Sequence, residues 1–262
     1  MDFYTSYKKI QWANKHITDI HAMLLAFGNL PNSYTLWIDH DAETGQNVLC
    51  VDLRQDLFPC ANIALTVGDA LHNLRSALDY MYYQSVLACD GLPSDYTRFP
   101  IFEERKKVES WLKSALEKWQ ISAEIFFLII DTIKPYAAGN PLLFALRQMN
   151  DRDKHQLFIP VLESMILLDV RLEDDKGIQV GKTGYYTDAS FRIRLMDANG
   201  KKVTVKDKGH ASPAIVFGPA TLFNSEPVIV ALSRIAVEVT NTIEAFEMLG
   251  LELPTFDDLP DL

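Results

Sequence analysis

One helical stretch, residues 68–79, carries a histidine, an arginine and a carboxylate at helical spacing. His72, Arg75 and Asp79 are separated by three and four positions, which places their side chains on consecutive turns of one helix face. A carboxylate beside a histidine fixes the tautomer of the imidazole and raises its basicity, as general acid–base catalysis requires. The spacing predicts either a catalytic site or a polar network that docks this helix against another.

A second polar segment could complete such a site. It supplies four candidate residues: Arg147 as a phosphate ligand, and Asp153, Lys154 and His155. Asp153 falls on the apolar stripe of a helix predicted over 141–157, where an unpaired carboxylate would be costly. Three explanations stay open: the helix breaks at Asn150, Asp153 pairs with a buried cation such as Arg75, or Asp153 belongs to a site.

The sequence favours no cofactor. It contains no dinucleotide-binding, P-loop, nucleophile-elbow or zincin motif. We therefore expect no resident metal, and a divalent cation on the histidines and aspartates named above is the less favoured alternative.

The elements that position these residues follow from hydrophobic periodicity. Residues 59–88 predict a long helix whose apolar positions occupy one arc: Ile63, Val67, Ala70, Leu71, Leu74, Ala77, Leu78 and Met81. Helical patterns occupy 1–33, 55–157 and 225–250, and Ser225 is the expected N-cap of the last helix. The segment 122–133 is apolar on all sides and is expected to be central.

Alternating β-type runs occupy 34–54 and 158–220. Residues 166–172 predict one strand, and Asn199-Gly200 predicts a hairpin between 191–195 and 203–205. We expect a single α+β domain over residues 1–262. Its helical bundle core would carry a small antiparallel sheet, built from the 34–54 hairpin and strands in 160–218.

Composition limits the classes of protein. The 262 residues are 48% hydrophobic, yet no run of about 18 apolar residues would span a membrane, and the start lacks a secretory signal. Three widely spaced cysteines without a CxxC motif indicate reduced thiols, and we expect a cytoplasmic protein. The formal net charge of −10 argues against general nucleic-acid binding.

Two phrases of the sequence resemble the signatures of an uncharacterised family of bacterial cytoplasmic proteins: GDALHNLRSALDY and NDRDKHQL, separated by an FPIF segment. More distantly, the helical pattern resembles the HEPN ribonucleases. In their motif a polar residue directly follows an arginine, and a histidine lies four to six positions after that arginine. Arg152 is followed by His155 at the third position, and Arg75 has Asp79 at the fourth. The resemblance implies RNA cleavage without a metal, usually by a dimer.

Two functional hypotheses follow. The first is a non-catalytic helical interaction module that binds a protein partner or itself as a homodimer. The alternative is a HEPN-like ribonuclease, in which His72 or His155 is the acid or base, and Asp79 or Asp153 orients it. Arg75 or Arg147 would then hold the phosphate. The net negative charge and the altered motif favour the first hypothesis.

Overall fold

The structure is a computed structural model that describes residues 3–41, 46–94, 96–119, 121–156, 161–174, 176–177, 185–186, 192–194, 203–218 and 221–250. The chain divides into two compact units. The helical unit comprises Met1–Thr18, Leu65–Ile159 and Val230–Leu262, and the β unit comprises Asp19–Ala64 and Pro160–Ile229. The expected α+β class is confirmed, and the single-domain organisation stays a prediction.

The described helices follow the predicted ranges closely. They are α1 (Tyr4–Gly28), α2 (Cys60–Leu87), α3 (Arg105–Trp119), α4 (Ala123–Phe127), α5 (Pro141–Gln156) and α6 (Val228–Glu247), with a short 3-10 helix, η1 (Gln55–Leu57), and a π-helix, η2 (Leu128–Ile133). All eight apolar positions predicted for the core face of α2 are fully buried. None of these helices has the length and apolarity needed to cross a bilayer.

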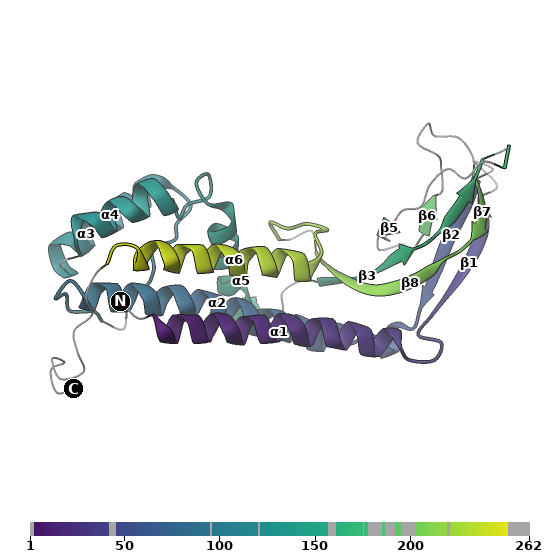
Figure 1. The fold of residues 1–262 in the computed structure, drawn as a ribbon, viewed down its shortest axis with the longest axis horizontal. Coiled ribbons are helices and arrows are strands. Elements are labelled where there is room, and N and C mark those ends of the chain that lie inside the picture. The colour runs from purple at the N-terminus through teal and green to yellow at the C-terminus, as the bar shows by residue number, and fades with distance from the viewer. Residues whose placement is uncertain are drawn as a thin grey trace. The chain divides into compact units, whose positions relative to one another are not determined.

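Within the helical unit, α1, α2 and α6 run side by side (Figure 1). Lys9 Nζ of α1 donates to Asn73 Oδ1 of α2 at 3.3 Å, and Tyr7 Oη of α1 donates to Glu247 Oε2 of α6 at 2.9 Å. The expectation that 122–133 is central on all sides is wrong, because Phe127 is 59% exposed. One face of α4 and η2 packs inward instead, through Ile125, Ile129, Ile130 and Ile133.

The β unit holds three small antiparallel sheets in its described residues. The strands are β1 (Tyr34–Asp41), β2 (Gln46–Leu53), β3 (Val161–Leu168), β4 (Arg171–Glu173), β5 (Tyr185–Tyr186), β6 (Arg192–Arg194), β7 (Thr204–Asp207) and β8 (His210–Phe217). Their orders are β1-β2-β6, β5-β3-β8 and β4-β7. The 34–54 hairpin is confirmed. The expected single sheet is corrected to three among the described strands, of which β6 joins that hairpin by pairing with β2.

Other sequence expectations for the β unit also need correction. The strands on either side of Asn199-Gly200 pair elsewhere, β6 with β2 and β7 with β4, and that turn lies outside the described residues. The strand expected over 166–172 breaks at Asp169, which takes a φ of +57°. Ser225 is not a helix cap, because its φ is +62° and α6 begins only at Val228.

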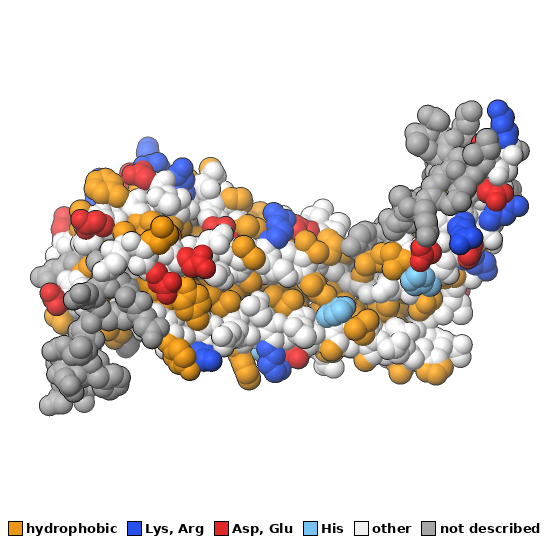
Figure 2. All heavy atoms as spheres, in the orientation of Figure 1, with side chains coloured by type: hydrophobic (Ala, Val, Ile, Leu, Met, Phe, Trp, Pro, Cys, Tyr) orange, Lys and Arg blue, Asp and Glu red, His pale blue; other side chains and the backbone are white. Residues whose placement is uncertain are grey.

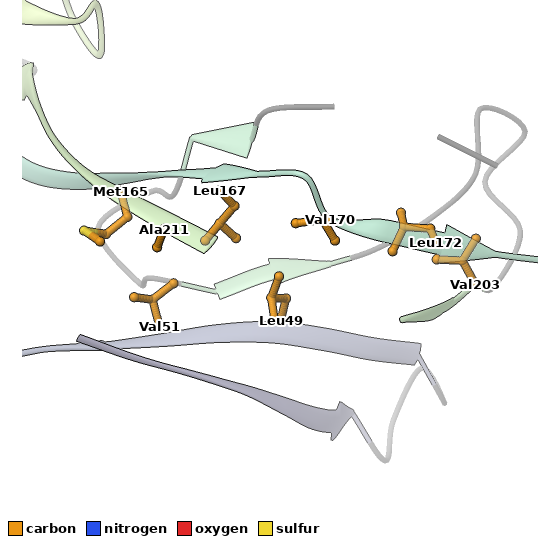
Figure 3. Close-up of a cluster of buried hydrophobic side chains, with 8 residues drawn as sticks. All are labelled: Leu49, Val51, Met165, Leu167, Val170, Leu172, Val203 and Ala211. Carbon is orange, nitrogen blue, oxygen red and sulfur yellow. The ribbon is translucent and has the colours of Figure 1, made fainter. Parts of the chain in front are cut away.

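The core of the β unit forms between the three sheets, all of which contribute side chains to it. Leu49 and Val51 of β2 point toward Met165 and Leu167 of β3 and toward Ala211 of β8 (Figure 3). Side chains two positions apart share one face of a strand, which is why alternate residues of β2 and β3 reach this core. The apolar pattern of the sequence therefore determines this packing.

Candidate functional site

Arg75 and Asp79 lie one turn apart on the same face of α2. Arg75 Nη2 lies 2.8 Å from Asp79 Oδ1, and the two side chains are 11% and 27% exposed. Helix residues four positions apart are neighbours, so the spacing read from the sequence makes this ion pair available. The carboxylate that would have oriented His72 thus contacts an arginine.

The same ion pair holds the backbone of Phe99, which belongs to no helix or strand. Arg75 Nη2 donates to Phe99 O at 2.7 Å, and Phe99 N donates to Asp79 Oδ1 at 2.9 Å. The buried Phe99 ring packs edge-on against Tyr82 and Phe246. A buried backbone group must find a partner. The side chains of Arg75 and Asp79 therefore supply the hydrogen-bond partners that a neighbouring strand would supply to the backbone of Phe99 in a sheet.

Arg147 of α5 plays the corresponding part for the next residues of the same segment. Its Nη1 donates to Ile101 O, and its guanidinium carbon lies 5.2 Å from the centroid of the Phe102 ring. Its Nε lies 3.4 Å from Asp151 Oδ2, one turn further along α5. The FPIF segment, residues 99–102, is therefore held by one arginine from each of two helices.

A pocket of about 290 Å³ opens where these groups meet, which we call the arginine pocket. Its lining includes Arg75, Arg98 and Arg147, the carboxylates Asp79 and Asp151, and Tyr96, Trp111 and Asn150. Sequence reasoning missed Arg98, because no spacing rule links that residue to either helix. The FPIF motif beside it was the only signal, and it had no assigned role.

Arg75 is the most constrained charge in the arginine pocket. Burial lowers its pKa, the charges of Arg147 and Arg98 lower it further, and Asp79 and Asp151 oppose these effects. An arginine nevertheless stays protonated at neutral pH. Among the described residues, its Nη1 is buried without a hydrogen-bond acceptor, which costs about 1–3 kcal/mol. Arg75 therefore places a positive charge beside this pocket while one of its own nitrogen atoms stays buried without an acceptor in the described part of the chain.

Asp153 approaches α2 at a different place, next to Gly68. A Cβ added to Gly68 would lie 2.5 Å from Asp153 Oδ1 and 2.8 Å from Oδ2. Real side chains do not pack this closely, so a side chain at position 68 would force the Asp153 carboxylate to move away from α2. The contact explains a glycine inside a helix, which would otherwise weaken it. The predicted association of 69–79 with 147–155 is supported here and in the arginine pocket.

Other predicted residues fall outside this arrangement. His72 is exposed on α2 and is not among the residues that line the arginine pocket. The side chains of Lys154 and His155 lie outside the described part of the structure, although the backbone of α5 continues through them. Of the three explanations left open for Asp153, the helix break at Asn150 is excluded, because α5 runs on to Gln156 and Asn150 is buried inside it.

A second, more open hollow of about 600 Å³ follows α2 beside the arginine pocket and shares Asp79 with it. We call it the tyrosine groove, because Tyr80 and Tyr83 line it and are 46% and 38% exposed. The rest of its lining consists of Ser76, Gln84, Leu87, Ser94 and Thr97. Gln84 Oε1 is buried and has no donor among the described residues.

Together, the two hollows provide cationic donors beside aromatic and hydroxyl groups. That combination can bind an anionic or aromatic ligand group. In the described part of the chain, no cluster of three or more histidine, cysteine or carboxylate side chains is arranged to hold a metal ion. No family model, curated protein or solved structure matches the chain.

Proposed function

We propose that this chain is a non-catalytic helical interaction module. Its binding face is the pair of adjoining hollows, the arginine pocket and the tyrosine groove, and its ligand is a protein partner or a second copy of the chain. The observation that carries the proposal is the set of contacts made by Asp79. This carboxylate binds Arg75 and the backbone of Phe99, so it serves to hold the FPIF segment. A catalytic role would require it to orient a histidine.

The tyrosine groove supports a binding role. Tyrosine is enriched in protein interfaces because it buries a large rigid surface and offers a hydroxyl group. Tyr80 and Tyr83 present both features on an open surface, and Leu87 extends their apolar edge. Figure 2 shows other hydrophobic side chains scattered among charged ones over α1 and α6. The groove differs from that scatter because its aromatic groups line one hollow.

We place this module in the bacterial cytoplasm. Cys50, Cys60 and Cys89 form no disulfide bond in the described part of the chain, and cysteines without disulfide bonds are typical of a reducing compartment. The resemblance of the two sequence phrases to a bacterial family supports the same placement.

The alternative is a HEPN-like, metal-independent ribonuclease. One observation favours it: Arg75 and Arg147, both candidate phosphate ligands, line the same pocket. Against it, the exposed His72 is absent from that lining. The mechanism needs an acid or base within hydrogen-bond reach of the proton it transfers. In this alternative His155 would supply that group, with Asp153 to orient it.

RNA turnover separates the two functions. The full chain is incubated with single-stranded RNA, beside His72→Ala, His155→Ala and the control His21→Ala, which removes another exposed histidine. An interaction module gives no turnover above buffer in any of the four proteins. Turnover by the wild type that falls at least a hundredfold in His72→Ala or His155→Ala, and not in His21→Ala, would establish the ribonuclease instead.

Binding is tested on the tyrosine groove. Sedimentation of the full chain across a concentration series measures self-association, and affinity capture followed by mass spectrometry identifies any protein partner. Tyr83→Ala should weaken the association by about tenfold or more, since truncation of a buried interface tyrosine costs over 1 kcal/mol. Tyr4→Ala, which removes an exposed tyrosine from α1, is the matched control. Equal association by both variants would contradict this binding face.

A further inference from the structure

We propose that the arginine pocket binds one phosphate group, presented by a phosphorylated side chain of the protein partner. This inference rests on the proposed function, because it names the chemistry that the binding face recognises. It also adds a residue, Arg98, that neither functional hypothesis contained. Arginine clusters are a recurrent means of recognising phosphorylated side chains.

The donors available in the pocket support the proposal. Arg75 lines the pocket, but its Nη1 is fully buried, so Arg75 contributes positive charge and not a direct hydrogen bond. Arg98 lines the same pocket from an exposed position, so its guanidinium can reach a ligand that enters from solvent. Arg147 adds a third guanidinium. Guanidinium groups form short, charge-assisted hydrogen bonds with phosphate oxygens, and their fork geometry matches them.

The pocket is also organised before any ligand arrives. Asp79 holds one side of Arg75, and Asp151 holds Arg147 from the same helix. Backbone carbonyls at Phe99 and Ile101 accept from the same two arginines. Side chains fixed in this way lose little conformational freedom when they bind, which favours affinity.

Charge limits the ligand to a single phosphate group. Among the described lining residues, three arginines face two aspartates, which leaves one net positive charge. The whole chain carries −10, so a polyphosphate or a long nucleic acid would be repelled outside the pocket. A volume of about 290 Å³ lies at the lower end of the range for ligand sites. One anionic group of a larger partner fits both limits.

Phosphate suits the guanidinium groups of this pocket better than carboxylate does. A planar carboxylate is satisfied by one bidentate arginine, whereas a phosphate monoester offers three strong acceptor oxygens in a tetrahedral arrangement. Arg98 and Arg147 lie on different segments of the chain, so their guanidinium groups approach the pocket from separate positions. Separate donors match a tetrahedral acceptor.

The test is calorimetric titration of the full chain with inorganic phosphate at fixed ionic strength, with acetate as a parallel titrant. Arg98→Gln removes an exposed donor and should fold normally. We expect its phosphate affinity to fall by about tenfold, the loss typical of one charge-assisted hydrogen bond. Arg105→Gln is the matched control, because Arg105 lies in the same unit but pairs with Glu109 and Asp131. Its affinity should equal that of the wild type.

Three results would overturn the inference: no phosphate binding by the wild type, equal losses in Arg98→Gln and Arg105→Gln, or acetate binding as tight as phosphate. The proposed function fails separately. Phosphate binding that depends on Arg98, in a chain that neither self-associates nor captures a partner, would leave the phosphate site standing without the interaction module. Partner capture that Arg98→Gln leaves unchanged, with Tyr83→Ala defective, would remove only the phosphate inference.

Discussion

The helical unit and the β unit satisfy the backbone of their extended segments in different ways. In the β unit, β2 pairs with β1 along eight residues and with β6 along three, so backbone groups bind other backbone groups. In the helical unit, Phe99 and Ile101 bind charged side chains from α2 and α5. Hydrogen bonds between strands form with most exposed side chains, because only backbone atoms take part. A segment held by an arginine and an aspartate loses its hydrogen bonds when either of those two residues is replaced. Substitution should therefore be far more damaging to the second arrangement.

The largest expected effect is at Asp79. Asp79→Ala removes the acceptor for Phe99 N and leaves the Arg75 guanidinium buried without its carboxylate, which should lower the free energy of unfolding by about 3 kcal/mol. Urea denaturation followed by circular dichroism measures the change. Asp56→Ala is the matched control, because the Arg54–Asp56 pair is more than half exposed on both sides, and solvent-exposed ion pairs contribute little to stability. Equal losses in the two variants would show that the FPIF segment does not depend on this pair.

Gly68 should show the next largest effect. An alanine inside a helix normally stabilises it by about 1 kcal/mol over glycine, but the new Cβ would collide with the Asp153 carboxylate. We expect Gly68→Ala to lower the free energy of unfolding by about 2 kcal/mol, as overpacking does.

The double variant Gly68→Ala/Asp153→Ala isolates this contact. The double variant should lose at least about 0.5 kcal/mol less free energy of unfolding than the sum of the losses in the two single variants. The reason is that the effects of substitutions at residues in contact are not additive. Additive losses would contradict the close approach of α5 to α2 at Gly68.

An exposed polar side chain on the β1–β2 ladder should matter little. Thr35 lies opposite Asp52 in the register and its side chain faces solvent. Thr35→Ala keeps every backbone hydrogen bond, so we expect a change of about 0.5 kcal/mol or less in the free energy of unfolding. A loss of unfolding free energy as large as that of Asp79→Ala would contradict the expectation that the strand ladder depends less on its side chains than the FPIF segment does.

The smallest effect, with the opposite sign, is expected at Tyr82. Its hydroxyl is buried without a hydrogen-bond partner among the described residues, and burial raises its pKa. Tyr82→Phe removes the unpaired hydroxyl and keeps the ring against Phe99 and Trp111, so stability should stay equal or rise by up to about 1 kcal/mol. A higher thermal midpoint would agree with this, whereas a loss above about 1 kcal/mol would reveal a partner for the hydroxyl.

The two sequence phrases predicted which helix faces are buried and which are polar, but they did not predict the contacts that the polar side chains make. The helical wheel of 59–88 separated its buried face from the face that carries Arg75 and Asp79, because a helix repeats every 3.6 residues whatever surrounds it. It could not show that Asp79 would bind Arg75 and Phe99 N, since Phe99 lies 20 positions away. Arg98 escaped notice for the same reason. The pairing predicted for the strands on either side of Asn199-Gly200 was wrong, because turn propensity is local, whereas β6 and β7 pair with strands far along the chain.

The sequence by itself determined the α+β class, the order of the main helices and the core face of α2, because these follow from local periodicity and local backbone preference. Tertiary structure alone decided that the FPIF segment is held between α2 and α5. It also brought Arg98 to Arg75 and Arg147, and it made Gly68 the residue that admits Asp153. Long-range contacts of this kind depend on how distant segments pack, which no local rule of spacing contains.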